Sequence, residues 1–131
     1  MLANRLRLIQ ISLVCLIAAV AVVLGSHFAR SEDAPPSYVA SPDVYKLLQQ
    51  NERFRIIEAT WKPGQRDNFH SHWANAVYHL TDCTERIYLP DGKFTDSSHK
   101  AGSTALQNPI PSHSFENRST AECRSVIVAA R

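Results

Sequence analysis

This 131-residue chain contains few glycines and cysteines, four and three respectively, and its formal net charge is only +2. The low net charge excludes a strong electrostatic attraction to nucleic acid, so no nucleic-acid partner is expected. The cysteines form no Cys-x-x-Cys pair, which excludes a thioredoxin-type motif. Without a glycine-rich phosphate loop or a Gly-x-Ser-x-Gly elbow, neither a P-loop kinase nor an α/β-hydrolase is expected.

The N-terminal segment differs in composition from the rest of the chain. Arg5 and Arg7 precede a mostly apolar run from Leu8 to Leu24. In length this run lies between a signal-peptide core and the about 20 residues of a membrane-spanning helix. The sequence predicts a signal peptide or a membrane anchor over residues 1–30. Because the positive flank stays in the cytoplasm, either alternative exports the domain, which would be periplasmic or anchored to the cytoplasmic membrane facing outward.

A polar, proline-containing stretch follows, and residues 31–38 are predicted to be a linker because they cannot bury much apolar surface. The folded domain is expected over residues 39–131. At its start, Ser41-Pro42-Asp43 is typical of a helix N-terminus, and apolar residues recur at helical spacing from Val44. This pattern predicts a short N-terminal helix that ends near Gln50.

From Arg53 onward the apolar residues alternate with a period of two, which predicts β-strands. Strands are expected over residues 53–61, 76–81, 86–89, 104–107 and 125–130, with a weaker polar strand over 94–100. Asp91-Gly92 favours a two-residue hairpin turn, since both residues tolerate the positive φ that such loops need. Many short strands and seven prolines predict an all-β barrel or jelly roll.

Two histidines, His70 and His72, are separated by a single residue. Side chains at i and i+2 on a strand point to the same face, so the two imidazoles would lie together. Neutral imidazole is a common ligand of Zn, Fe, Ni and Cu ions. A lone pair of this kind also arises by chance on surface strands, so a metal site requires a third ligand. His113 provides it downstream.

The spacing of these histidines resembles the two cupin motifs. Gly64, five further residues and His70-Ser71-His72 are similar to the first motif. His113 and Asn117, with Gly102 upstream, are similar to the second. The resemblance covers about residues 44–131 and is to the small single-domain cupins. It implies a cupin-type jelly-roll β-barrel in which the three histidines bind a divalent Fe, Mn, Ni or Zn ion.

The chain departs from the first motif at its carboxylate ligand. That glutamate would stand at Ala76 or Val77, and neither residue is acidic. The sequence therefore predicts a three-histidine site rather than three histidines and a carboxylate. If the glutamate position is Val77, His79 lies one pleat along on the same inward face, as a pocket residue or further ligand. If it is Ala76, His79 faces outward. Asn117 is also a candidate pocket residue or ligand.

Three other polar residues were assigned from their strand positions. Arg86 and Tyr88 share one face of their predicted strand, where they could bind an anionic substrate and donate a proton. The alternative is a solvated arginine beside a core aromatic residue. His99 lies in the polar stretch and is expected to be exposed to solvent.

Cys83 and Cys123 are the only cysteines outside the apolar N-terminal run. In cupin barrels the strand after the first motif and the last strand are antiparallel neighbours, so the resemblance implies that these two cysteines lie close together. An exported domain meets an oxidising compartment, which favours a disulfide. The alternative is two separate buried thiols.

Two classes of function are consistent with these features. In the first, the domain is an enzyme, an oxygenase or isomerase acting on a small molecule, as in the three-histidine thiol dioxygenases that share the cupin fold. In the second, it is a non-catalytic binding or sensing module that uses the same pocket. Both imply a small-molecule substrate or ligand and membrane contact only through the N-terminal segment. A homodimer is a further possible assembly.

Overall fold

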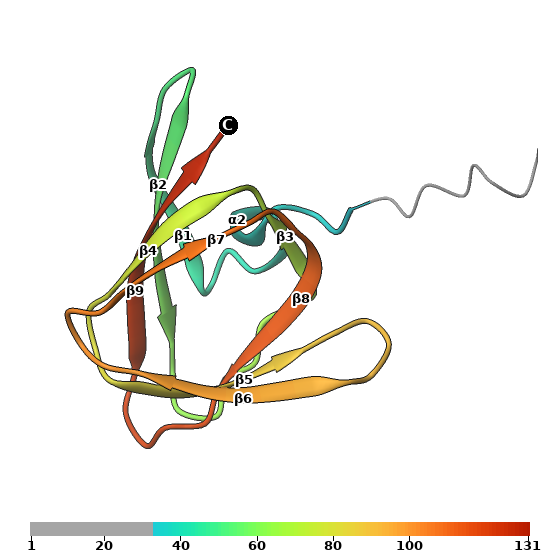
Figure 1. Cartoon of the computed structure of the whole chain (residues 1–131), viewed down its shortest axis with the longest axis vertical. Coiled ribbons are helices and arrows are strands. Elements are labelled where there is room, and N and C mark those ends of the chain that lie inside the picture. The colour runs from blue at the N-terminus through green and yellow to red at the C-terminus, as the bar shows by residue number, and fades with distance from the viewer. Residues whose placement is uncertain (1–32) are drawn as a thin grey trace, which may run out of the picture. The chain divides into compact units, whose positions relative to one another are not determined.

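Nine strands and one short helix make up the part of the chain that the computed structural model describes, residues 33–131 (Figure 1). The signal peptide or anchor expected over residues 1–30 lies outside the described residues. Within residues 33–131, no helix has the length and apolar character that spanning a membrane requires. The prediction of an all-β domain is confirmed, and the one short helix lies at the N-terminal side of the strands but not at the predicted residues.

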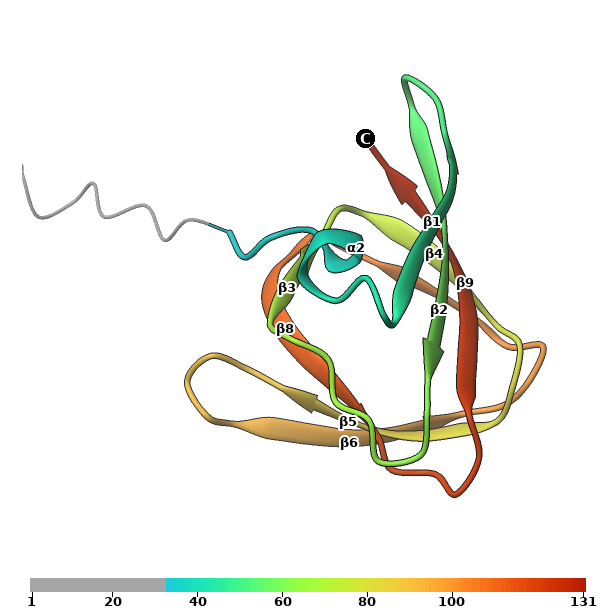
Figure 2. The ribbon, with the colours of Figure 1, turned by 180° about the vertical axis from the view of Figure 1, so that it is seen from behind.

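The strands form two antiparallel sheets that enclose the core. The first sheet has the order β1-β2-β9-β4-β7, with bounds Tyr45–Gln50, Phe54–Trp61, Cys123–Ala130, Asn75–His79 and Thr104–Gln107. The second has the order β3-β8-β5-β6, with bounds His70–His72, Ile110–Asn117, Cys83–Tyr88 and Phe94–His99. Strands that are distant in the sequence lie side by side in both sheets, which is the arrangement of a jelly roll (Figures 1 and 2).

The period-two pattern explains how the central strands form the core. Along β2, alternate residues up to Trp61 are buried, and the residues between them are exposed or half-buried. β9 pairs with β2 over its full length and shows the same alternation. Ile57, Ile127 and Val77 therefore meet inside the barrel with Phe115 of the other sheet. The strand predictions in this region are confirmed.

The helix predicted from Pro42 to about Gln50 is wrong. Residues Tyr45–Gln50 form β1, which pairs with β2. The actual helix, α2, is Ser37–Ala40, and it contacts β1 and β3 (Figure 2). Ser41-Pro42-Asp43 makes only a turn, in which the backbone N–H groups of Val44 and Tyr45 donate to Ser41 O. The same residue types favour turns and helix starts, and pairing with β2 decides between them.

The described end of the predicted linker packs on the barrel. The backbone N–H of Ala34 donates to Pro111 O, and that of Ser71 donates to Pro35 O. Ser37 is buried at the start of α2. The compact unit therefore begins at Asp33, because backbone hydrogen bonds to the second sheet hold a segment that buries little apolar surface.

A disulfide joins Cys83, at the start of β5, to Cys123, at the start of β9. Their Cα atoms are 5.3 Å apart, and the sequence separation is 40 residues. The bond links the two sheets, because β5 belongs to the second sheet and β9 to the first. The predicted pairing is confirmed. Since disulfides persist in oxidising compartments, the bond is what an exported domain would have.

Candidate metal centre and its cavity

Two neighbouring strands bring the three predicted histidines together. β3 carries His70 and His72, and β8 carries His113, which is paired directly with His70. The three residues are 0%, 8% and 7% exposed, respectively. One ring nitrogen from each lies within 4.8 Å of the other two. A single ion could therefore contact all three imidazoles from the inside of the barrel.

The hydrogen bonds of these rings show which nitrogens are free to bind an ion. His70 Nδ1 lies 2.8 Å from Asn68 O and must donate to it, because a carbonyl oxygen only accepts. His70 Nε2 therefore carries a lone pair, and it lies 3.0 Å from Nε2 of His72. His113 Nε2 is buried and has no hydrogen-bond partner within residues 33–131. Converging nitrogens, one of them orphaned, fit a divalent metal ion.

The backbone oxygen of Asn68 orients His70, since it accepts the hydrogen bond from Nδ1. A partner of this kind fixes the tautomer and orientation of a ligating imidazole. The Asp67 carboxylate lies nearby, 3.6 Å from the same nitrogen. It accepts hydrogen bonds from Tyr45 Oη at 2.8 Å, from Trp61 Nε1 at 2.9 Å and from the backbone N–H of Phe115 at 2.7 Å, and so holds the residues around His70 in place.

Tyr45 is a site residue that the sequence did not reveal. Its hydroxyl oxygen lies 3.1 Å from His70 Nε2, and its ring packs against Trp61. The residue was assigned to a helix, and only its place on β1 turns it inward. Burial, and then the charge of Asp67, raise the pKa of Tyr45 well above its usual value, so the phenol keeps its proton.

Burial keeps the histidines neutral. Burial first, and then the neighbouring rings of His70 and His113, lower the pKa of His72 to about 3. Burial, followed by the charge of His70, lowers the pKa of His113 to about 3. The pKa of His70 is also lowered by burial, against the opposing effect of Asp67. At neutral pH all three imidazoles therefore offer lone pairs, as metal ligands must.

These pKa values predict an acid-sensitive metal-free protein. His72 and His113 have pKa values of about 3 when folded, against 6.5 ordinarily, so the unfolded chain binds more protons between these values. The free energy of unfolding should therefore fall by several kcal/mol as the pH drops through this window. Urea unfolding of chelator-treated protein at a series of pH values measures it. In His113→Gln the dependence should be shallower, and a flat profile in the unsubstituted protein would contradict the assignment.

Valine occupies the position of the missing carboxylate. Val77 is buried and faces the cavity beside the histidines, whereas Ala76 is exposed. Of the two positions considered for the missing glutamate, Val77 is the one whose side chain faces the histidines. Within residues 33–131, no carboxylate belongs to the histidine group. The centre has three histidine donors and no acidic one.

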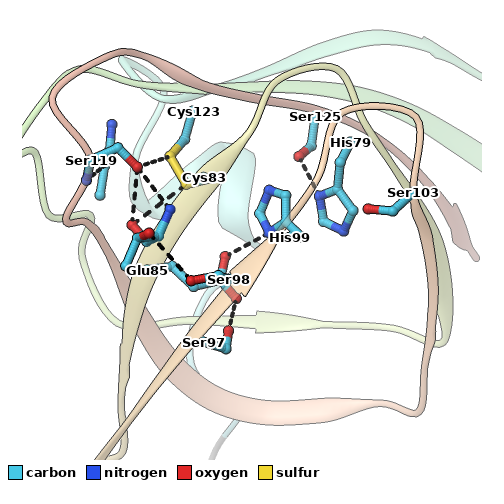
Figure 3. Close-up of polar contacts among 12 residues, drawn as sticks. His79, Cys83, Glu85, Ser97, Ser98, His99, Ser103, Ser119, Cys123 and Ser125 are labelled. Atoms are coloured by element: carbon cyan, nitrogen blue, oxygen red, sulfur yellow. Dashed lines mark hydrogen bonds and ion pairs between the residues drawn. A yellow bond between two sulfur atoms is a disulfide. The ribbon is translucent and has the colours of Figure 1, made fainter.

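A cavity of about 60 Å³ lies between the two sheets, lined by His72 and His113 of the centre. It is also lined by His79, Glu85, His99 and Ser125, which are drawn in Figure 3. His79 faces inward, in agreement with the Val77 alternative. Its ring stacks on His99 with the centroids 3.5 Å apart, and its Nδ1 lies 3.2 Å from Ser125 Oγ. His79 is thus a cavity residue and not a member of the histidine group.

The expectation that His99 is exposed is wrong. Its side chain is 13% exposed, and its Nδ1 lies 3.3 Å from Glu85 Oε2 (Figure 3). The cause is strand pairing, because β6 follows β5 along its full length and places His99 opposite Cys83. The weak strand predicted over residues 94–100 is thus a complete strand, and its last residue, His99, reaches the cavity.

The assignment of Arg86 and Tyr88 to the site is not supported, because both lie on the outer face of β5. Glu85 and Ile87 line the cavity, so the residues between and after them point outward. Arg86 Nε lies 2.6 Å from Asp96 Oδ1. The hydroxyl of Tyr88 donates to Glu116 Oε2 at 2.5 Å. Strand alternation separates both side chains from the histidines.

Asn117 was predicted to be a pocket residue or a ligand, but its side chain is used elsewhere. It is fully buried, and its amide nitrogen donates to Trp61 O at 3.0 Å and to Ala121 O at 2.8 Å. Its side-chain oxygen accepts from the backbone N–H of Ser119 at 2.7 Å. These bonds use the amide to hold the connection between β8 and β9, so Asn117 has a structural role.

No protein-family model matches the sequence, and no curated protein matches it. Solved structures do match the fold. A cupin domain from Bordetella pertussis Tohama I is 20% identical, with a TM-score of 0.62 over 75% of this chain and 96% of that chain. An RmlC-like cupin family protein with a double-stranded β-helix fold, from Methanocaldococcus jannaschii, is 15% identical, with a TM-score of 0.52 over 66% and 78%.

The polyketide cyclase RemF from Streptomyces resistomycificus is also similar. It is 23% identical, with a TM-score of 0.50 over 66% of this chain and 63% of that chain. At these identities the similarity establishes architecture, because one fold carries many activities. The strand order, the inward histidines and the matching structures together show that residues 33–131 have the cupin fold.

Proposed function

We propose that this domain is a metal-binding cupin that acts on a small molecule. His70, His72 and His113 would hold one divalent Fe, Mn, Ni or Zn ion. The observation that carries the proposal is the convergence of three buried ring nitrogens within 4.8 Å, with His113 Nε2 left without a hydrogen-bond partner among the described residues. A bound ion would supply Lewis-acid or redox chemistry to a small ligand.

The surrounding residues would orient the centre and exclude water. The backbone oxygen of Asn68 holds the His70 ring, and Asp67 holds the neighbouring Tyr45 and Trp61 by hydrogen bonds. Val77, Phe115 and other apolar side chains form much of the cavity wall. A cavity of about 60 Å³ has room for several water-sized groups, because each needs about 10–15 Å³ of such space. The substrate would enter with a small reactive group.

Catalysis and simple binding make different experimental predictions. The similarity to a polyketide cyclase supports an enzyme, because it shows that the cupin fold can carry catalysis. Metal-loaded protein should be incubated with small thiols and small carboxylic acids while dioxygen uptake and product masses are measured. Turnover that is lost in the His70→Ala/His72→Ala protein would support an oxygenase or isomerase. Ligand-dependent melting shifts with no product would support the binding module instead.

We also propose that the N-terminal segment exports the domain to the periplasm or anchors it there. The proposal rests on the apolar run Leu8–Leu24 and on the disulfide of the domain. A fusion of residues 1–38 to a reporter that is active only outside the cytoplasm should be active. The same fusion without Leu8–Leu24 should be inactive, and equal activity of the two would contradict export. The size of the fusion protein on a gel then separates a cleaved signal from an anchor.

A further inference from the structure

Arg55, the second residue of β2, carries a guanidinium in which two buried nitrogens have no hydrogen-bond partner within residues 33–131. The residue is 9% exposed, and its Nε and Nη1 atoms are buried without a hydrogen bond. None of the ion pairs in this part of the chain includes Arg55. A buried charge is costly unless it is paired, so this arginine indicates an anionic partner that is not part of the described chain.

One side of the guanidinium is already held in place. Its central carbon lies 4.1 Å from the centroid of the Trp73 ring, a cation–π arrangement. Stacking of this kind fixes the plane of the group and leaves its N–H donors unused. The guanidinium is therefore preorganised to receive an acceptor in its own plane.

A second unsatisfied polar atom belongs to the same inner face. In the first sheet, Arg55 is paired with Ala129, and Ala129 is paired on its other side with Asn75. Asn75 is buried, and its amide nitrogen donates to Trp73 O at 2.9 Å. Its Oδ1 has no hydrogen-bond partner in the part of the chain that the structure describes. The small side chain of Ala129 separates an unused donor group from an unused acceptor. A ligand that satisfies both would carry an acceptor and a donor.

This row of residues continues to the cavity of the histidine centre. Asn75 is paired with Gln107 of β7. Gln107 lines the cavity together with His72, which directly precedes Trp73 in the chain. Through these pairings Arg55 and Asn75 stand in the row of residues that leads to the cavity beside the histidine centre.

We propose that Arg55 binds the carboxylate of the small molecule that reaches the histidine centre, and that Asn75 accepts a hydrogen bond from a neighbouring hydroxyl or amino group. This inference rests on the proposed function and narrows its substrate class to small hydroxy- or amino-carboxylic acids. A carboxylate accepts from two guanidinium nitrogens at once, which gives both charge neutralisation and a fixed orientation.

The test uses L-lactate as a probe and its neutral analogue lactamide as a control. Each is titrated into the ¹⁵N-labelled full chain in detergent micelles, both metal-free and loaded with Zn²⁺. The side-chain N–H signals of Arg55 and Trp73 report binding. We expect saturable shifts with lactate and none with lactamide, because only lactate carries a charge. Loading with Zn²⁺ should tighten lactate binding if the ligand reaches the histidine centre.

Substitutions then test the role of the guanidinium. Arg55→Gln should weaken lactate binding about 10- to 100-fold, the usual effect of losing hydrogen bonds to a charged group. The affinity of Arg55→Lys for lactate should be intermediate, because lysine keeps the charge but cannot donate two parallel hydrogen bonds to one carboxylate. Arg53→Gln is the matched control. It removes the same charge from an exposed position two residues earlier and should bind lactate as the unsubstituted protein does.

Equal shifts with lactate and lactamide, or unchanged lactate affinity in a folded Arg55→Gln protein, would overturn the inference. If that variant fails to fold, the Arg55 and Trp73 signals of the unsubstituted protein still decide the outcome. The result also separates the two proposals. Arg55-dependent lactate binding in a protein that does not bind Zn²⁺ would contradict the metal centre and support the carboxylate site. Zn²⁺ binding without an effect of lactate on the Arg55 signals would support the metal centre and contradict the carboxylate site.

Discussion

Alanine at His70, His72 or His113 is expected to lower the affinity for a divalent metal ion by more than about 100-fold. Loss of an outer residue that only orients a ligand typically costs about 10- to 100-fold, and loss of a direct ligand should cost more. The remaining two imidazoles would leave an incomplete set of protein donors. Competition between the protein and a chromophoric chelator for Zn²⁺ measures the effect for each variant.

His79→Ala is the matched control for these substitutions. His79 lines the same cavity, but it stacks on His99 and contacts Ser125 rather than joining the histidine group. Its replacement should change the Zn²⁺ affinity by only a few-fold. A loss as large as that of the three ligand variants would instead make His79 a fourth ligand, in the place of the carboxylate missing at Val77.

Removal of the disulfide should have the largest effect on stability. The Cys83→Ala/Cys123→Ala protein is expected to lose about 4 kcal/mol in the free energy of unfolding, because the bond closes a loop of 40 residues. A domain of this size buries only a modest fraction of its surface on folding, so its total free energy of unfolding is small. Urea unfolding of both proteins, followed by circular dichroism, gives the difference.

Two controls separate the bond from other effects of the substitutions. Treatment of the unsubstituted protein with dithiothreitol should reproduce most of the loss. Cys15→Ser should leave the unfolding curve unchanged, because Cys15 belongs to the N-terminal apolar run. The bond itself is checked by alkylating the untreated protein and measuring its mass. Alkylation of both Cys83 and Cys123 would show two free thiols and contradict the bridge.

Local signals were enough to predict most of the strands. The alternation along Phe54–Trp61 reflects one buried and one exposed face. The turn at Asp91-Gly92 is present as predicted, and Gly92 has a φ of 85°. Asp91 does not have the positive φ expected of a two-residue loop, since within residues 33–131 only glycines have one. The error at β1 has a physical cause. Ser41-Pro42-Asp43 suits a turn as well as a helix start, and the pairing of Tyr45 with Ala59 is a contact between distant segments.

The histidine centre was predictable because its residues follow a motif spacing, whereas the residues around it depend on strand register. A register shift of one residue moves a side chain to the opposite face of its sheet. This is why Arg86 and Tyr88 were assigned to the site while Glu85, their inward neighbour, was not. His99 and Arg55 reach the interior only through the pairings of β6 with β5 and of β2 with β9. Such pairings are not visible in a single sequence.

Elemental analysis of the natively produced protein tests the metal centre most directly. The unsubstituted protein and the His70→Ala/His72→Ala protein should be purified in parallel without added metal or chelator, and both should be shown to be folded. The three-histidine centre predicts about one Fe, Mn, Ni or Zn ion per chain in the first and a trace in the second. Equal metal content in the two proteins would contradict it, and so would an unsubstituted protein that remains metal-free after incubation with these ions.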